Sequence, residues 1–242
     1  TEVNTPAPLP TKTGSPVLSI SVGELTLLVV AFEHAAGAEP DIGDGLPEWF
    51  ERLGAVTATL HAHSRRWQLP EGFVRKHWNL ETMISAQGLW GDWRNAPSMT
   101  MNEAHTISEA IPYIKSEIAL YGTAPHRYGL VHADLRLTNL LVSGEGMSII
   151  DFDDCGFCWY AYDFAAALSF HAMLDTFILI RRILLCAWLA THQESQEGQA
   201  LGSDFSRDTA VMAQRYMTQR GHPVRDGYLP DDLQRHHNVR MA

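Results

Sequence analysis

The chain has 242 residues, of which 45% are hydrophobic, and a formal net charge of −10 from 28 acidic and 18 basic residues. This length allows one large domain or two small ones, and the hydrophobic fraction allows a buried core, which excludes global disorder. The negative charge argues against a nucleic-acid binder that works by neutralising phosphates. Three cysteines, an odd number, provide no disulfide framework.

The apolar runs do not indicate a membrane protein. Residues 25–32 are too few to span a bilayer, and the run at 177–190 is interrupted by Arg181 and Arg182. Residues 1–16 lack the apolar core of a signal peptide. We therefore expect a soluble, cytoplasmic protein with no membrane partner.

The predicted elements begin with a β-hairpin. Residues 1–16 contain four prolines and are expected to form a loop. Residues 17–22 and 25–32 have the composition of strands, and Gly23 and Glu24 separate them. This pattern predicts an antiparallel pair.

A largely helical region follows. Apolar residues recur at helical spacing from Pro47 to His61 and again over 102–122, where Pro112 is expected to cause a kink. Further helices are predicted at 163–171, 173–192 and 205–220, and a loose tail after them. We interpret the tryptophans of residues 75–95 as core packing, with a pocket wall as the alternative. Strands followed by a helical body indicate an α+β fold rather than a doubly wound sheet.

Residues 131–157, VHADLRLTNLLVSGEGMSIIDFDDCGF, carry the densest group of polar side chains. The apolar segments 140–142 and 147–151 flank the turn-forming residues SGEG, which predicts a small hairpin. This hairpin places Asn139 at the start of one strand beside Asp151 at the end of the other. Asp134 lies on the preceding loop, with His132 packed beneath that loop to fix its turn.

These side chains suit phosphoryl transfer. An amide oxygen beside a carboxylate suits Mg²⁺, which takes few protein oxygens and completes its shell with water and phosphate. A second carboxylate on a loop is placed to accept the proton of an attacking hydroxyl. The residues therefore favour Asn139 and Asp151 as metal ligands and Asp134 as the base.

The pattern His132-x-Asp134-x4-Asn139, followed by Asp151-Phe152, resembles the catalytic loop and metal aspartate of the protein-kinase-like fold. The longer stretch VHADLRLTNLLV…IIDFDDCGFCWYAYDFAAALSF is similar to the aminoglycoside phosphotransferase family, which includes choline and homoserine kinases. The resemblance implies an α+β, protein-kinase-like fold. Residues 1–36 would be a partial small lobe and hinge, and residues 37–242 a helical large lobe with the catalytic loop and the metal-binding hairpin.

The resemblance also implies an ATP- and Mg²⁺-dependent phosphotransferase that acts on a hydroxyl of a small molecule, such as an aminoglycoside, an amino alcohol or homoserine. Residues 32–37, FEHAAG, would be the adenine hinge. The backbone groups that receive adenine would then belong to Ala31, Phe32, Glu33 and His34. No nucleic-acid partner is expected, and the oligomeric state and the exact substrate stay open.

The roles of some polar residues in this region stay open. Arg136 is either a cation near the transferring phosphate, as in related kinases, or a surface arginine. Asp153 and Asp154 would contact the metal, bind a substrate amine or cap the next turn. Asp163 would start the next helix and brace the catalytic loop.

Two parts expected of such a kinase are not recognisable in this chain. The first is the small-lobe lysine on a strand, because the three lysines of this chain are Lys12, in a predicted turn, and Lys76 and Lys115, in the helical body. No Gly-rich loop precedes the first strand. We therefore expect the N-terminal part of the small lobe to be absent, either because segments are omitted or because the chain is a degenerate nucleotide- or ligand-binding module. The intact set of Asp134, Asn139 and Asp151 favours omission.

Overall fold

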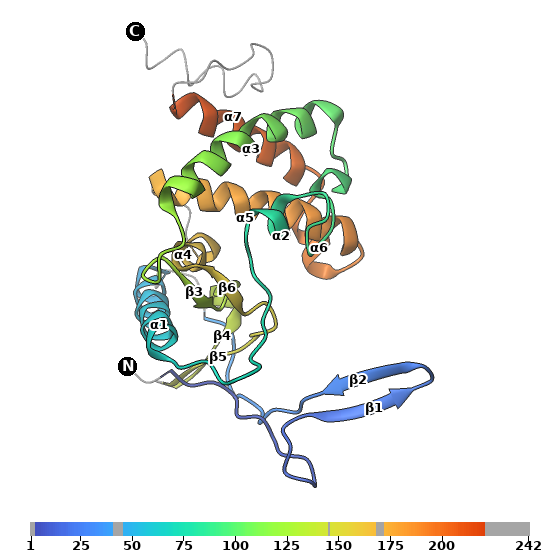
Figure 1. The fold of residues 1–242 in the computed structure, drawn as a ribbon, viewed down its shortest axis with the longest axis vertical. Coiled ribbons are helices and arrows are strands. Elements are labelled where there is room, and N and C mark those ends of the chain that lie inside the picture. Colours follow the sequence, from blue (N-terminus) through green and yellow to red (C-terminus); the bar gives the residue numbers. More distant parts are fainter. Residues whose placement is uncertain (1–2, 41–45, 145, 168–171, 221–242) are drawn as a thin grey trace.

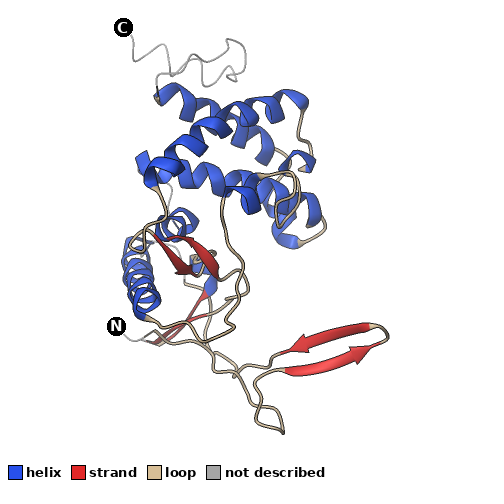
Figure 2. Cartoon of the chain, viewed as in Figure 1, coloured by secondary structure: helices blue, strands red, loops and turns tan. Residues whose placement is uncertain are grey.

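The computed structural model describes residues 3–40, 46–144, 146–167 and 172–220 (Figure 1). Its strands form three antiparallel pairs: β1 (Leu18–Val22) with β2 (Leu25–Val29), β3 (Tyr128–Val131) with β6 (Gly156–Trp159), and β4 (Leu140–Ser143) with β5 (Gly146–Ile149). The helices are α1 (Leu46–Arg66), α2 (Leu80–Ile84), α3 (Met101–Tyr121), α4 (Tyr160–Ala167), α5 (Ala172–Thr191), α6 (Gln196–Leu201) and α7 (Phe205–Gln219). Small strand pairs beside a helical body confirm the α+β prediction (Figure 2).

The predicted N-terminal hairpin is confirmed. Leu18 pairs with Val29 and Val22 with Leu25, and the turn between them contains Gly23 at φ 62°. The second strand ends at Val29, earlier than predicted. The hairpin extends away from the rest of the molecule, and the side chains of both strands are exposed (Figure 1).

The helix predicted at 102–122 is α3, and its two ends show why it forms there. Thr100 caps the N-terminus through a reciprocal pair of hydrogen bonds with Glu103. Gly122, at φ 72°, ends the helix, and its N–H donates to the carbonyl of Ile118. Pro112 lies inside the helix.

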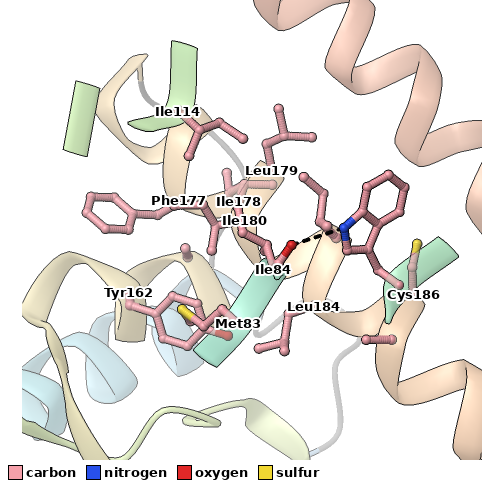
Figure 3. Packing of buried hydrophobic residues seen from close by; sticks show 14 of the residues in the cluster. Met83, Ile84, Ile114, Tyr162, Phe177, Ile178, Leu179, Ile180, Leu184 and Cys186 are labelled. Carbon is pink, nitrogen blue, oxygen red and sulfur yellow. Dashed lines mark hydrogen bonds between the residues drawn. The ribbon is translucent and has the colours of Figure 1, made fainter. Parts of the chain in front are cut away.

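The main core lies where α3, α5 and α7 pack together (Figures 1 and 3). Trp78 and Trp93 are fully buried in it, and the indole Nε1 of Trp93 donates to the carbonyl of Ile84 at 3.1 Å (Figure 3). Trp90 packs edge-on against Trp78, with ring centroids 5.3 Å apart. Core packing is therefore the correct interpretation for these tryptophans.

A second, smaller core connects α1 to the predicted catalytic region. Leu53 and Val56 of α1 are buried with Leu135, Leu140 and Ile149. These three residues belong to the loop after β3 and to the β4–β5 hairpin. Burial of their apolar surface therefore holds the loop and the hairpin against one helix.

The C-terminal helices differ from the prediction in their bounds. The helix predicted at 163–171 starts earlier, at Tyr160, and is described to Ala167; residues 168–171 and the predicted tail, 221–242, lie outside the described part. The α6 helix was not predicted because six residues are too few to show a period. In the described ranges, no helix has the length and apolar character needed to cross a membrane.

Candidate active site

The loop after β3 is anchored by a carboxylate that has no contact with solvent. Asp163 on α4 is 0% exposed. Its Oδ1 accepts from the N–H of Ala133 at 2.8 Å, and its Oδ2 accepts from the N–H of His132 at 3.4 Å. Ala133 has φ 69°, a left-handed conformation that is costly for alanine and persists only where the surroundings impose it. Asp163 therefore holds the loop in an unfavourable backbone conformation, although it lies in the first turn of α4 rather than at its start.

His132 lies between the loop and the chain that follows β5. Its Nε2 is 3.1 Å from the carbonyl oxygen of Ile150, and its ring lies 4.5 Å from the ring of Phe152. Its Nδ1 accepts from the N–H of Asp134 at 3.4 Å. Only 2% of the histidine is exposed. Its contacts connect Asp134 to the segment around Asp151.

Three side chains contact the carboxylate of Asp134, the one acidic residue of the loop. Its Oδ2 accepts from Nε of Arg136 at 3.1 Å and from Nδ2 of Asn139 at 3.1 Å. Its Oδ1 contacts the guanidinium of Arg181, which comes from α5. Sequence reasoning missed Arg181, because it is 47 residues from Asp134 and looked only like an interruption of an apolar run.

Asn139 joins the loop to the β4–β5 hairpin. Its Nδ2 also donates to the carbonyl of Asp134 at 2.8 Å, and its own carbonyl accepts from the N–H of Ile150 at 3.1 Å. Because the amide nitrogen points to Asp134, the amide oxygen is the atom that can ligate a cation. The residue after Ile150 is Asp151, which adopts φ 67°. The hairpin therefore places Asn139 opposite Ile150, one residue before Asp151, whereas the prediction placed Asn139 beside Asp151 itself.

The electrostatics around Asp151 fit a cation. A hydrogen bond between the carboxyl of Asp151 and Asp153 raises the pKa of Asp151 to about 6, and burial and the negative charges of Asp153, Asp134 and Asp154 add to this effect. The same hydrogen bond lowers the pKa of Asp153. Carboxylates that must share a proton are a donor set that a divalent cation would stabilise.

Asn139 and Asp151 offer an amide oxygen and a carboxylate, which are hard oxygen donors. In the described part of the chain, no cluster of three or more His, Cys, Asp and Glu side chains has the arrangement of a metal site. Mg²⁺ usually takes one or two carboxylates, with water and phosphate oxygens for the remaining positions.

The segment before α2 holds the loop that follows Asp151. Arg75 Nη2 donates to the carbonyl of Phe152 at 2.6 Å, and the indole of Trp78 donates to the carbonyl of Asp154 at 2.7 Å. Lys76 Nζ lies 2.8 Å from Oδ1 of Asp154. Asp154 is thus engaged in a structural ion pair, whereas Asp153 faces Asp151.

A cavity of about 330 Å³ lies between the predicted hinge and the β4–β5 hairpin. Its lining combines residues 4–6, residues 33–36, Leu141, Ser143 and residues 146–148. Of the four residues predicted to receive adenine, Glu33 and His34 line this cavity, and Ala31 and Phe32 do not.

One side of the hinge backbone is bonded to residues 7 and 9. The carbonyl of Ala31 accepts from the N–H of Leu9 at 2.7 Å, and the N–H of Glu33 donates to the carbonyl of Ala7 at 2.9 Å. Successive residues of an extended chain direct their polar groups to opposite sides. The edge opposite residues 7–9 is therefore formed by Phe32 and His34.

The end of the hinge is packed directly onto the hairpin. The N–H of Ala38 donates to the carbonyl of Val142 at 3.1 Å, and the N–H of Val142 donates back to Ala38 at 2.8 Å. Gly37 lies in this contact at φ 134°, and a Cβ there would be 2.6 Å from the carbonyl oxygen of Val142. Only glycine permits this close approach.

A family model described as the phosphotransferase enzyme family matches residues 3–213, which include the hinge, the loop, the hairpin and the anchoring aspartate. The chain belongs to the phosphotransferase enzyme family. The predicted resemblance to aminoglycoside phosphotransferases and choline kinases is therefore confirmed.

Two solved structures and one curated protein show how this phosphotransferase-family chain relates to others. A microcompartment-associated aminopropanol kinase is 34% identical, with a TM-score of 0.80, over 92% of this chain and 78% of that one. Amicoumacin kinase hAmiN, in complex with AMP-PNP, Ca²⁺ and Ami, is 17% identical, with a TM-score of 0.68, over 86% of this chain and 72% of that one. Both matches extend over most of this chain, and the protein-kinase-like fold is confirmed.

Amicoumacin kinase of Bacillus subtilis (strain 168) is 24% identical over 163 residues, which is 66% of this chain and 46% of that protein. This member of the phosphotransferase family thus spans about half the length of the curated relative that it matches.

Proposed function

We propose that this protein transfers the γ-phosphoryl group of ATP to a hydroxyl of a small molecule. The observation that carries the proposal is the contact of Asn139 with Asp134 at the base of the hairpin that leads to Asp151. It brings a general-base candidate and two metal-ligand candidates together in a family of phosphotransferases.

In the proposed reaction, Asp134 orients the acceptor hydroxyl and takes its proton while the hydroxyl oxygen attacks the γ-phosphorus. The bond from that phosphorus to the bridging oxygen breaks, and ADP leaves. Arg136, whose side chain is 46% exposed, is free to turn from Asp134 toward the transferring phosphate and offset its charge. His132 holds the backbone of Asp134 by accepting a hydrogen bond from its N–H.

Asn139 and Asp151 would hold Mg²⁺, which would neutralise charge on the nucleotide phosphates. The chemistry of the donor set supports this assignment, because Asp151 and Asp153 share a proton and the Asn139 amide oxygen is not the atom that bonds Asp134. A related kinase crystallised with AMP-PNP and Ca²⁺ supports the use of a nucleotide with a divalent metal.

Residues 31–34 would receive the adenine through backbone groups, with Glu33 and His34 at the cavity and Leu141 as one of its apolar walls. In this proposal residues 1–36 are the partial small lobe and hinge, and residues 37–242 are the large lobe. The nucleotide would lie between them.

An amino alcohol is the substrate class that we favour. The solved structure with 34% identity is an aminopropanol kinase. Asp153 adds a carboxylate next to Asp151, and a substrate ammonium group would stabilise it.

The test is ADP formation by the full-length protein with Mg²⁺ and ATP. The acceptors are 1-amino-2-propanol, ethanolamine, choline, homoserine and an aminoglycoside, and phosphorylated products are identified by mass spectrometry. We expect the largest kcat/KM with an amino alcohol. Nucleotide binding without transfer to any acceptor would overturn the catalytic proposal and favour a degenerate binding module.

A further inference from the structure

We propose that Arg181 on α5 is a positioning residue that holds the Asp134 carboxylate in its working orientation. This inference rests on the proposed function, because it assigns Arg181 a role in the same phosphoryl transfer.

Arg181 makes three contacts around the catalytic loop with one guanidinium group. Its Nη2 pairs with Oδ1 of Asp134, and its Nη1 donates to the carbonyl of Ala133 at 3.1 Å and to the hydroxyl of Tyr162 at 3.2 Å. Only 10% of its side chain is exposed. A buried charge with this many partners is a fixed part of the structure rather than a surface residue.

Arg181 is the second side chain that holds Ala133, the loop residue in the left-handed conformation. Asp163 accepts from the N–H of Ala133, and Arg181 donates to the carbonyl of the same residue. The two peptide groups that flank Ala133 are therefore held from two helices, α4 and α5. The next side chain along the loop is Asp134, so its direction follows from both contacts.

The two arginines at Asp134 differ in their freedom to move. Arg136 belongs to the loop itself, and 46% of its side chain is exposed. Arg181 belongs to a core helix, where the neighbouring Ile180 and Ile183 are 0% exposed. When Arg136 leaves Oδ2 for a phosphate, Arg181 stays on Oδ1, and the carboxylate keeps its orientation while Oδ2 becomes available to the acceptor hydroxyl.

Lysine cannot replace this arginine. A guanidinium presents several donors in a rigid plane, whereas an ammonium group is a single point on a flexible stem. Arg181→Lys keeps the positive charge but cannot reach Asp134, Ala133 and Tyr162 together. We expect kcat to fall by roughly 10²-fold, the effect of a misplaced catalytic group, with little change in the KM for ATP.

The adjacent Arg182 offers a matched control. It lies on the same helix, and its guanidinium donates to Oγ1 of Thr209 and to the carbonyl of Phe205, both at 3.2 Å. These contacts join α5 to α7 and do not involve the loop. Arg182→Lys should lower the melting temperature about as much as Arg181→Lys does, but it should leave kcat unchanged.

A double-mutant cycle separates positioning from a general loss of structure. If Arg181 acts through Asp134, Arg181→Lys should have little further effect on kcat in an Asp134→Asn background. Tyr162→Phe removes one hydrogen-bond acceptor of Arg181 and replaces Arg181→Lys as the test if that variant does not fold. Tyr162→Phe should lower kcat by a smaller factor than Arg181→Lys. Multiplicative losses in the cycle, or an Arg182→Lys variant with the same kcat loss, would overturn the positioning role.

The wild-type measurement tests the proposed function separately. If wild-type protein transfers no phosphate, that function is wrong, and crystal structures of Arg181→Lys and Arg182→Lys then decide the structural part of the inference. An Asp134 carboxylate that keeps its wild-type orientation in Arg181→Lys would overturn it. A carboxylate displaced only in Arg181→Lys would support it.

Discussion

The Nε2 atom of His61 on α1 lies 2.8 Å from Oδ2 of Asp163 on α4, 102 residues further along the chain. The His61 ring also packs against Tyr160, with centroids 4.6 Å apart. Asp163 is the residue that holds the backbone of the proposed catalytic loop, so α1 supports the site through His61 as well as through Leu53 and Val56. A fully buried carboxylate needs such partners, because its desolvation is otherwise costly.

Replacement of His61 by alanine should therefore destabilise the protein. Asp163 would lose a hydrogen-bond partner inside the core, which costs about 1–3 kcal/mol of unfolding free energy. Urea denaturation measures the change. The control is His63→Ala on the same helix, where the histidine is exposed and the effect should stay within about 0.5 kcal/mol. Equal losses in the two variants would contradict the anchoring role of the His61–Asp163 pair.

Asp134 and Asp151 are proposed to have different roles, so their variants should differ in their effects on nucleotide binding and turnover. Asp134→Asn removes the proposed base, so kcat should fall by roughly 10²–10⁴-fold while the affinity for Mg·ATP is nearly kept. Asp151→Asn removes a proposed metal ligand, so both affinity and turnover should be lost. Calorimetry gives the affinities, and a phosphate-transfer assay gives the rates. If Asp134→Asn weakened nucleotide binding as much as Asp151→Asn, the assigned roles would be wrong.

Nucleotide binding should also depend on the packing of the hinge. In Gly37→Ala, the new Cβ would be 2.6 Å from a backbone oxygen of Val142, so the hinge must move away from the hairpin. We expect a loss of about 1–3 kcal/mol in stability and weaker binding of ATP in calorimetry. Gly54→Ala in α1 is the control, because its Cβ meets no atom within 4 Å. It should leave ATP binding unchanged and stabilise the helix by up to about 1 kcal/mol.

The Mg²⁺-dependent binding of ATP should weaken at low pH. Asp151, whose pKa is raised to about 6, is protonated below that pH in the metal-free enzyme and must release its proton to ligate a metal. The Mg²⁺-dependent part of ATP affinity, measured above and below pH 6, should therefore fall as the pH is lowered.

Asp153→Asn is the variant that isolates this effect. It removes the carboxylate whose hydrogen bond is the main cause of the raised pKa, so the loss of affinity should move to lower pH. The phosphates of ATP titrate equally with both proteins, so the difference reports on Asp151. Asp154→Asn should shift the profile less, because the charge of Asp154 is the weakest of the causes. An unchanged profile in Asp153→Asn would show that Asp153 does not control the ionisation of Asp151.

Much of the candidate site was determined by local sequence. The spacing of His132, Asp134 and Asn139 and the turn residues between β4 and β5 predicted the loop and the hairpin, because hairpin register follows from short-range turn chemistry. The helix over 102–122 and the core packing of the tryptophans could also be predicted from periodicity and residue type. The same motif also indicated the family.

Contacts between distant segments were decided only by the tertiary structure. Arg181 reaches Asp134 because α5 packs against the loop after β3, and nothing in the sequence near Arg181 marks it as a partner of a carboxylate. His61 reaches Asp163 only because α1 packs against α4, and no pattern near His61 predicts this partner. A side chain's partner across the fold depends on how helices pack, and packing is set by burial summed over many residues rather than by any local pattern.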